Sequence, residues 1–470
     1  MMMDLATSST SMLAPHVAIA GAGPVGLLCA ILLCRLGISV TLLEKSLGGN
    51  PWSAKSYSIN LNERGLTSLE YAGVLDEAKS VGMARHRFVM ENALTGEQQQ
   101  IPRDPPQYGF TRPGLVECLE TFLQKHYADK VTIHRGVSVQ DIVIHRRSKE
   151  DTDVDKTSCA NDDSDNGKEG TISSIDVILD NGSKITCTHV IGADGKWSAV
   201  RNAVPDFNGK FQIQMEPTWG ISITPSNTPE RWHCDALNVF RPAAKDSKYY
   251  IIAAPLPPDH HKSATTAQQQ QQQQQYSISI ICFDEIQQDH PWLLPREDQD
   301  SVLDWYEYGS RTAASETDSV FQQRLSNLLQ NDVPLFHKDL VGDQQKFATS
   351  VRINRRVSWL KATSDHPQYC DSSGRIALVG DAAHAMTPSI GEGCNCALES
   401  AVSLIQSLIS TTTSGKKQLQ NQETIITVED LTRAILEYGT KRPAQVIPFQ
   451  ERSAAGNRYQ QPEPSKTNGK

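Results

Sequence analysis

Three short stretches carry glycine and acidic residues at spacings that suit nucleotide binding. The first, HVAIAGAGPVGLLCAILLCRLGISVTLLEK, places Gly21, Gly23 and Gly26 between an apolar run and a helical pattern. Gly21 permits a tight turn, Gly23 lets a pyrophosphate approach the backbone, and Gly26 allows close helix–strand packing. Glu44 ends the next apolar run, where a carboxylate can accept hydrogen bonds from an adenosine ribose. An acid at this point favours FAD or NAD over NADP.

The other two stretches also join an apolar run to a helical pattern through a glycine turn. HVIGADGKWSAVRNAV has Asp194 and Gly195 at its turn, and RIALVGDAAHAMTPSIGEGCNCALESAVSLI has Gly380 and Asp381. The apolar helix of the third stretch is expected from Cys394 onward. Free N–H groups at a helix start carry partial positive charge, so this end suits an electron-rich ligand. The segment alone does not identify that ligand.

The elements that must position these turns are predicted from hydrophobic periodicity. We expect a strand at 17–20, a helix at 27–36, a strand at 39–43 and a further strand at 376–379. A strand, glycine turn, helix and strand in this order predict an α/β, Rossmann-like domain. Only one GxGxxG is present, and there is no redox cysteine pair, so a pyridine-nucleotide disulfide reductase is excluded.

Composition narrows the function further. The chain has 470 residues, a net charge of −9 and no basic cluster, so a nucleic-acid partner is not expected. Its 10 cysteines lack CxxC spacing, which predicts reduced thiols and no metal site. The longest apolar run is broken by glycines, Pro24 and Arg35, so no transmembrane segment is expected, and the N-terminus resembles neither a signal peptide nor a presequence. A cytoplasmic location follows as the expectation.

Taken together and in order, the three stretches resemble the single-component flavoprotein aromatic hydroxylases, the group A flavoprotein monooxygenases. The fingerprints of that family are GxGxxG, DGxxSxVR and GDAAHxxxPxxGxGxN, and this chain has DGKWSAVR and GDAAHAMTPSIGEGCN. The resemblance covers roughly residues 16–410. It implies one FAD bound without a covalent bond, NADPH or NADH as a transient electron donor, and O₂. The reaction implied is hydroxylation of a small aromatic substrate through a hydroperoxyflavin.

The resemblance also implies roles for residues of this chain. Asp381 would hold the ribityl chain of FAD, Gly380 would let the cofactor pass close to the backbone, and Arg112 would lie near the flavin and its phosphates. The residues implied to line the isoalloxazine ring are Pro388, Gly391, Gly393 and Asn395. No dedicated catalytic side chain is implied, because the flavin carries the chemistry. His384 is expected to be a packing residue, and Glu392 to be solvated.

The family suggests how the chain divides. A flexible N-terminus at 1–15 precedes an FAD-binding domain at 16–205, which 345–410 completes. A β-rich, substrate-covering domain is expected as an insertion at 206–344, and a C-terminal helical and polar tail at 411–470. Polar stretches predict a disordered insertion at about 145–170, a glutamine loop at 268–275 and a disordered segment at 411–423.

Within the family, the chain is most similar to the kynurenine 3-monooxygenase group, through SINLNERGLTSLEYAGVLDEAKSVGM and ENALTGEQQQIP. That group binds its amino-acid substrate with an arginine before the LTG turn and a tyrosine directly after Ile-Pro. Here Val89 occupies the position in register, so the cation must come from Arg103, Arg85 or Arg87. Arg103 is the first choice because it follows Ile-Pro, and Tyr108 is the candidate tyrosine. The same likeness implies a possible mitochondrial association.

Two other functions stay open on the sequence. One is a flavin-dependent epoxidase or reductase acting on a lipidic substrate, since such enzymes share the fingerprints. The other is a non-catalytic flavin-binding module. The intact Asp194–Gly195 and Gly380–Asp381 turns count against the second alternative.

Overall fold

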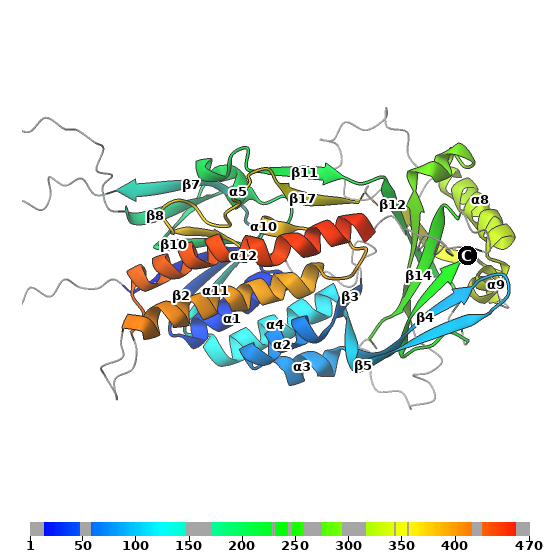
Figure 1. Cartoon of the computed structure of the whole chain (residues 1–470), viewed down its shortest axis with the longest axis horizontal. Helices are drawn as coiled ribbons and strands as arrows, with labels where there is room; N and C mark the ends of the chain where they lie inside the picture. Colours follow the sequence, from blue (N-terminus) through cyan, green and yellow to red (C-terminus); the bar gives the residue numbers. More distant parts are fainter. Residues whose placement is uncertain are drawn as a thin grey trace, which may run out of the picture.

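The computed structural model describes residues 14–47, 58–146, 172–227, 229, 231–242, 247–257, 275–293, 316–342, 345–354, 357–415 and 425–456. Most of the segments expected to be flexible, at 1–15, 145–170 and 268–275, lie outside these ranges, as does the end of the C-terminal tail. The molecule is elongated, with a helix-rich half and a sheet-rich half side by side (Figure 1).

A parallel sheet forms the centre of the helix-rich half. Its strands lie in the order β18 (Ile376–Leu378), β10 (His189–Gly192), β1 (His16–Ala20), β2 (Ser39–Glu44) and β6 (Val131–Arg135). The three glycine turns follow β1, β10 and β18, which are neighbours and parallel. The carboxyl ends of parallel strands meet at one edge, so this order brings the three turns together. The sheet confirms the predicted Rossmann-like fold.

The helices of this half pack in a layer against the sheet. α1 (Pro24–Arg35) is buried around almost its whole circumference, as its uniformly apolar sequence requires. α11 (Gly393–Gly415) packs against α1 and against the long α12 (Val428–Gly456) (Figure 1). The remaining helices of the layer are α2 (Glu63–Ala72), α3 (Leu75–Val81) and α4 (Arg112–Tyr127).

The helix ends differ from the sequence-based expectation in two places. α1 begins at Pro24 rather than at residue 27, because proline is favoured in the first turn, where its missing N–H costs nothing. α11 continues to Gly415, so residues 411–415 are helical and not part of a disordered segment. The hydroxyl of Thr412 donates to the carbonyl of Leu408 within that last stretch.

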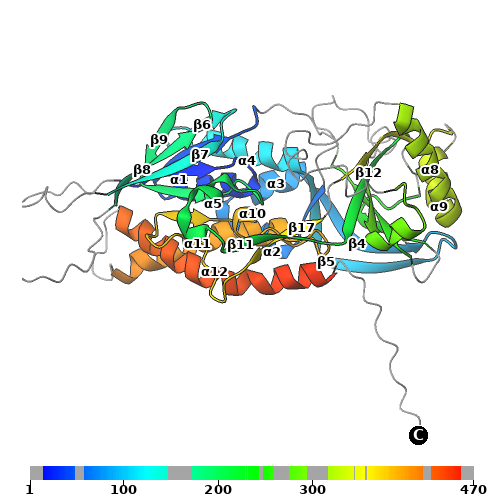
Figure 2. The same ribbon diagram turned by 90° about the horizontal axis from the view of Figure 1, so that it is seen from above.

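The sheet-rich half is built on one large mixed sheet. Its strand order is β16 (Ala348–Ile353), β12 (Thr218–Pro225), β15 (Tyr276–Phe283), β14 (Tyr249–Pro255), β13 (Ala236–Arg241), β4 (Met83–Asn92), β5 (Gln98–Thr111) and β3 (Ser58–Leu61). Residues of β15 alternate between buried and partly exposed, as a sheet with one covered face requires. α8 (Glu316–Asp332) and α9 (Pro334–Val341) cover that face (Figure 2). Leu329 and Phe336 from these helices belong to its apolar core.

This sheet contains strands from both sides of the domain boundary that is expected at residue 205. Strands β3, β4 and β5, from residues 58–111, were assigned to the FAD-binding domain, yet they form one side of the large sheet. β4 pairs in parallel with β13, and β5 pairs with both β4 and β3. The sequence does not reveal such a pairing, because its partners lie far apart along the chain.

Smaller elements complete the fold. β7 (Val139–Arg146), β8 (Ile172–Leu179) and β9 (Lys184–Cys187) form a separate sheet, and β11 (Phe211–Met215) pairs with β17 (Ser358–Ala362) in a ribbon between the halves (Figures 1 and 2). Short helical turns are α5 (Ala199–Ala203), α10 (Asp381–His384), η2 (Pro205–Phe207) and η3 (Asp284–Gln288). Within the described ranges, no helix combines the length and the apolar character needed to cross a bilayer.

Candidate active site

The glycine turn after β1 leaves the start of α1 free to bind a phosphate. Gly21 has a φ of +96°, and a Cβ there would meet the carbonyl oxygen of Ala193 at 2.5 Å. Gly23 is the N-cap of α1 and no side chain caps the helix. Among the described residues, a Cβ on Gly23 would have only the Arg112 guanidinium nearby, at 3.7 Å. Open backbone N–H groups, the helix dipole and an adjacent cation together fit a pyrophosphate.

Glu44 lies beside this turn, at the end of β2. Its carboxylate accepts hydrogen bonds from the backbone N–H of Ala22 at 2.9 Å and of Ser46 at 2.8 Å. Glu44 therefore braces the glycine turn, and it is placed where the sequence predicts the contact with the adenosine ribose. That contact remains a prediction.

Replacing Glu44 by alanine is expected to weaken FAD binding by about one to two decades, because each charge-assisted hydrogen bond contributes about 1.5–3 kcal/mol. Titration of the apoprotein with FAD, followed by flavin fluorescence, measures this. Glu70→Ala, at an exposed position of α2, is the matched control and should bind FAD as the wild type does. An unchanged dissociation constant in Glu44→Ala would mean that another group holds the ribose.

The second turn carries a buried carboxylate oxygen without a partner. One oxygen of Asp194 accepts from the N–H groups of Ala199 and Val200, so Asp194 caps α5. The other oxygen, Oδ1, is buried and has no hydrogen-bond partner among the described residues. A buried acceptor of this kind needs a donor, and a hydroxyl of the cofactor can supply one. Gly195, with a φ of +85°, has nothing within 4 Å of where a Cβ would lie.

The third turn meets the first. Gly380 has a φ of +64°, and a Cβ on it would come within 3.2 Å of Val25 in α1. Asp381 follows; it reaches solvent, and protein atoms lie close around its carboxyl. Burial raises the pKa of the Asp381 carboxyl, and the cations of Lys196 and Arg112 act in the opposite direction. The three motifs thus converge at one edge of the parallel sheet, as the strand order requires.

The loop between α10 and α11 presents an open face. Pro388 and Gly391 are exposed, and no atom of the described part of the chain lies within 4 Å of where a Gly391 Cβ would be. Asn395 is 1% exposed, and its side chain donates to the carbonyls of Asn60 and Gly391 at 3.1 and 2.9 Å. Gly393 begins α11. An open loop fixed from behind by Asn395 fits the expectation that these residues line a planar ring.

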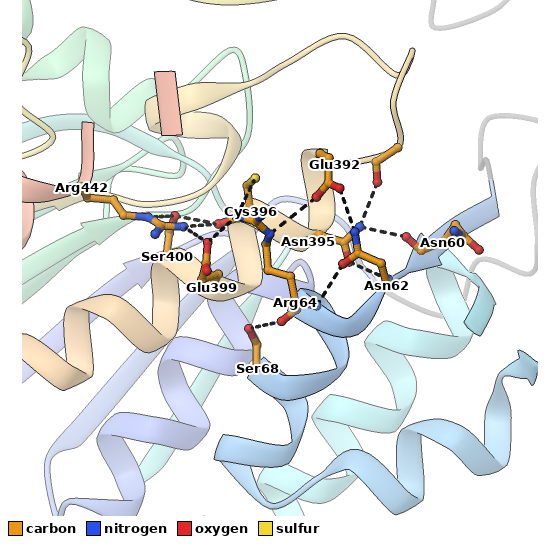
Figure 3. A network of polar contacts seen from close by, with 11 residues as sticks. Asn60, Asn62, Arg64, Ser68, Glu392, Asn395, Cys396, Glu399, Ser400 and Arg442 are labelled. Carbon is orange, nitrogen blue, oxygen red and sulfur yellow. Dashed lines mark hydrogen bonds and ion pairs between the residues drawn. The ribbon is translucent and has the colours of Figure 1, made fainter. Parts of the chain in front are cut away.

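Two neighbours of this loop were given non-catalytic roles from the sequence. His384 is fully buried, and its Nε2 lies 2.8 Å from the Ser400 hydroxyl, so its environment is that of a packing residue. Glu392 was expected to be solvated, but its side chain is only 18% exposed. Its Oε1 accepts from the Asn62 side chain at 2.8 Å, and its Oε2 lies 3.7 Å from Nε of Arg64 (Figure 3). The solvated interpretation is wrong because α2 covers this carboxylate.

The three candidate substrate cations lie in different surroundings. Arg103 is exposed on β5, and Arg87 pairs with Asp235 at 2.7 Å. Arg85 is 2% exposed, and its guanidinium donates to Asn60 Oδ1, the Ser58 hydroxyl and the carbonyl of Pro255 at 3.1, 2.9 and 2.8 Å. Among the described residues Arg85 has no carboxylate partner, and its Nε–H has no acceptor.

Tyr108, the candidate tyrosine, points away from Arg85. Its ring lies 5.6 Å from the ammonium of Lys79 on α3 and is stacked at 6.5 Å on Phe110. The guanidinium of Arg85 lies instead over Gly109, where a Cβ would meet it at 2.2 Å. Successive residues of a strand face opposite sides, so Tyr108 and Arg85 lie on opposite faces of β5.

Sequence reasoning missed the residues that connect the ring loop to the rest of the site. These are Asn60 on β3 together with Asn62 and Arg64 at the start of α2. Asn62 is the N-cap of α2, since its side chain accepts from the N–H of Arg64, and SINLNER carries that capping signal. Nothing in the sequence signals the contact between Asn62 and Glu392. The described residues contain no group of His, Cys, Asp and Glu that could hold a metal ion.

Comparisons with known proteins agree with this geometry. A family model described as an FAD binding domain matches residues 15–424. Kynurenine 3-monooxygenase from Debaryomyces hansenii is 22% identical over 431 residues, which cover 88% of this chain and 76% of that protein. The enzyme of the same name from Stenotrophomonas maltophilia is 26% identical over 402 residues, covering 84% of this chain and 71% of that protein.

Solved structures share the fold. Klebsiella pneumoniae HpxO complexed with FAD and uric acid has a TM-score of 0.62 at 17% identity, over 96% of this chain and 90% of that chain. The tetrameric form of 2-methyl-3-hydroxypyridine-5-carboxylic acid oxygenase has a TM-score of 0.57, also at 17% identity, over 94% and 90% of the two chains. The uncapped start of α1, the open space at Gly23 and the unpaired oxygen of Asp194 all fit FAD. The chain belongs to the FAD binding domain family, and it is an FAD-dependent monooxygenase of the aromatic hydroxylase type.

Proposed function

We propose that this monooxygenase hydroxylates an aromatic substrate that carries a carboxylate, and that Arg85 binds this carboxylate. The observation that supports the proposal is a buried guanidinium with no carboxylate partner among the described residues. Kynurenine, an aromatic amino acid, is the first candidate because two of the relatives are named kynurenine 3-monooxygenase. We place the carboxylate-binding role at Arg85 instead of Arg103, the residue favoured from the sequence, because Arg103 is exposed.

Energetics favour an anionic ligand at Arg85. Burial lowers the pKa of the Arg85 guanidinium to about 10, which still leaves it charged at neutral pH. A buried charge is costly unless it is paired, and the acceptors around Arg85 are all neutral: an amide, a hydroxyl and a carbonyl. A guanidinium has five N–H donors, and the Nε–H is still unpaired. A carboxylate would satisfy both the charge and the remaining donor.

The position of Arg85 also supports a role in substrate binding. Asn60 accepts from Arg85 through its side chain and from Asn395 through its backbone carbonyl. One residue therefore separates the buried cation from the loop proposed to line the flavin ring. Pro255, which also accepts from Arg85, belongs to β14 of the large sheet. Arg85 thus lies where the two halves of the molecule meet, which is where a substrate would be enclosed between sheet and cofactor.

The chain's own residues would then bind and orient the reactants. Bound FAD supplies the redox and oxygen chemistry, with electrons from NAD(P)H. Arg85 would hold the carboxylate end of the substrate and so direct its aromatic ring toward the loop of Pro388 and Gly391. Backbone N–H groups at the start of α11 would face the electron-rich end of the cofactor. The large sheet would exclude water from the space between them.

The alternatives left open by the sequence are less well supported. A lipidic substrate has no anionic group at its reacting end, so it would leave the Arg85 charge buried and unpaired. The non-catalytic module does not agree with a family whose relatives are named as monooxygenases.

The proposal is tested with a matched pair of aromatic compounds. Kynurenine should accelerate NADPH or NADH oxidation and yield a hydroxylated product, with little peroxide released. Kynurenamine, which lacks only the carboxylate, should have a KM at least about tenfold higher, since a charge-assisted contact contributes about 1.5–3 kcal/mol. Product is measured by mass spectrometry and peroxide by a coupled peroxidase. Equal KM values for the two compounds, or turnover of uncharged aromatics only, would contradict the carboxylate anchor.

A further inference from the structure

The loop proposed to line the flavin ring is fixed by side chains of α12, the last described helix. Gln450, 2% exposed, donates to the carbonyls of Leu360 and Ala385 at 2.8 and 3.2 Å. Ser453 exchanges hydrogen bonds with Thr387: its hydroxyl donates to the Thr387 carbonyl, and the Thr387 hydroxyl donates to the Ser453 carbonyl, each at 2.7 Å. Residues 385–387 are therefore tied to the C-terminal end of α12, in addition to the backbone hydrogen bond from Leu360 of β17 to the Ala385 carbonyl at 2.9 Å.

Arg442 of α12 holds the other end of the loop. Its side chain is 3% exposed and reaches the first turns of α11 (Figure 3). Nη2 donates to the carbonyl of Cys396 at 3.1 Å and to Glu399 at 2.7 Å, and Nε donates to the Ser400 hydroxyl at 3.0 Å. Arg442 thus holds the first turns of α11, which begins at Gly393, against α12.

A second arginine, Arg64, contacts the same turns of α11 from the side opposite Arg442. Arg64 of α2 pairs with Glu399 at 3.1 Å and lies 3.7 Å from Glu392, and its guanidinium carbon is 4.0 Å from the centroid of the Phe449 ring on α12. Figure 3 shows the two arginines on either side of Glu399. Two cations therefore balance two carboxylates, so the network adds no net charge next to the loop.

We propose that α12 holds the loop of the flavin site in place, and that Arg442 and Gln450 are positioning residues for the reaction. This inference rests on the proposed placement of the flavin ring at residues 388–395. The loop has a proline, an exposed glycine in a left-handed conformation and one turn hydrogen bond, from the N–H of Gly391 to the carbonyl of Pro388 at 3.2 Å, so contacts from outside the loop add to its restraint. Reacting groups must be held to within about 1 Å, because a displacement of that size costs about 100-fold in rate. The side chains of α12 supply this restraint without touching the reactants.

The test uses the full chain with FAD and needs no knowledge of the substrate. We compare Arg442→Met and Gln450→Leu with Lys441→Met, whose parent side chain is 68% exposed and pairs only with Glu437 among the described residues. The measurements are the FAD dissociation constant, the visible spectrum of bound flavin, its reduction potential, and the peroxide released with NADPH alone. Both α12 variants should raise the dissociation constant about tenfold and shift the spectrum and potential, as expected for one lost charged or buried hydrogen bond. Lys441→Met should match the wild type.

The possible outcomes separate this inference from the proposed function. The inference would be overturned if Arg442→Met and Gln450→Leu bind FAD with the wild-type spectrum, reduction potential and rate of peroxide release. It would also be overturned if Arg442→Met, Gln450→Leu and Lys441→Met all lower the melting temperature of the apoprotein and the affinity for FAD to the same extent. Loss of FAD with an unchanged melting temperature of the apoprotein would support it. Arg442→Lys keeps the charge but not the fork-shaped set of donors, so it should lie between Arg442→Met and the wild type. A failure of kynurenine as substrate would leave these measurements unaffected.

Discussion

Gly26→Ala is expected to abolish FAD binding and to destabilise the fold, whereas Gly23→Ala should abolish FAD binding alone. A Cβ on Gly26 would lie 1.9 Å from the carbonyl oxygen of Gly21, which is backbone and cannot move aside. The change should lower the free energy of unfolding by about 3 kcal/mol or more, because α1 must separate from its turn. A Cβ on Gly23 meets no protein atom closer than 3.7 Å, so the apoprotein tolerates it. That methyl group would occupy the space needed by the pyrophosphate.

Thermal unfolding of the apoproteins and FAD titration distinguish the two variants. The Gly23→Ala apoprotein should melt at the same temperature as the wild-type apoprotein and should remain colourless when FAD is added. Its affinity for FAD should fall by at least about 100-fold, because a displaced phosphate contact costs about 3 kcal/mol. Gly26→Ala should melt at a lower temperature and also remain colourless. If Gly23→Ala binds FAD like the wild type, the cofactor does not approach the backbone at this glycine.

The second large effect is expected from Arg85→Met. The KM for a carboxylate-bearing substrate should rise by about 10- to 100-fold, because a buried charge-assisted pair is lost. Methionine has a similar length and no charge, but it leaves the acceptors of Asn60, Ser58 and Pro255 without their donor, which costs stability. The melting temperature should therefore fall while FAD content stays at the wild-type level, and the kinetics are measured well below the melting temperature. Steady-state kinetics with kynurenine and with a neutral analogue measure the loss.

Arg103→Met is the matched control for Arg85→Met. Its parent side chain is exposed on the same pair of strands, so the KM should stay at the wild-type value. If the KM rises strongly in Arg103→Met and does not rise in Arg85→Met, Arg103 binds the substrate carboxylate, as the sequence favoured. A loss confined to the neutral analogue would contradict any anionic substrate.

The sequence predicts those parts of the site that depend on local geometry. Gly21, Gly23 and Gly26 act within one turn and the start of one helix, so their spacing carries the information, and the structure places them accordingly. The order of three such turns along the chain was enough to indicate the family. The fold class was accessible for the same reason, because each strand–turn–helix unit has its own hydrophobic period.

The choice between Arg85 and Arg103 was not accessible, because it depends on strand register. β4 and β5 pair Arg85 with Gln107 but Arg87 with Pro102, so residues 103–106 bulge out of the register. Arg103 falls in that bulge and faces solvent, while Arg85 turns toward β3 and β14. A bulge of this kind leaves no signature in a single sequence beyond its prolines.

The role of α12 could have been found from the sequence. Its buried apolar residues recur at Leu431, Ile435, Tyr438 and Val446, and Arg442 occupies the missing position of that stripe. A charged residue on the buried face of a helix needs partners inside the protein. The polar composition of the tail concealed this pattern, because its exposed faces are rich in charged and amide side chains.

The sharing of the large sheet between distant parts of the chain has a consequence for synthesis. Arg87 on β4 and Asp235, which precedes β13, are 148 residues apart in the sequence but are joined by an ion pair. At ribosomal rates of about 5–20 residues per second, β4 must wait roughly 7–30 s for its neighbour to emerge. During that interval an apolar strand edge stays unpaired, and such edges are sites of aggregation. A single cut in the chain therefore cannot separate the two halves, because the large sheet combines strands from residues 58–111 with strands from residues 218–353.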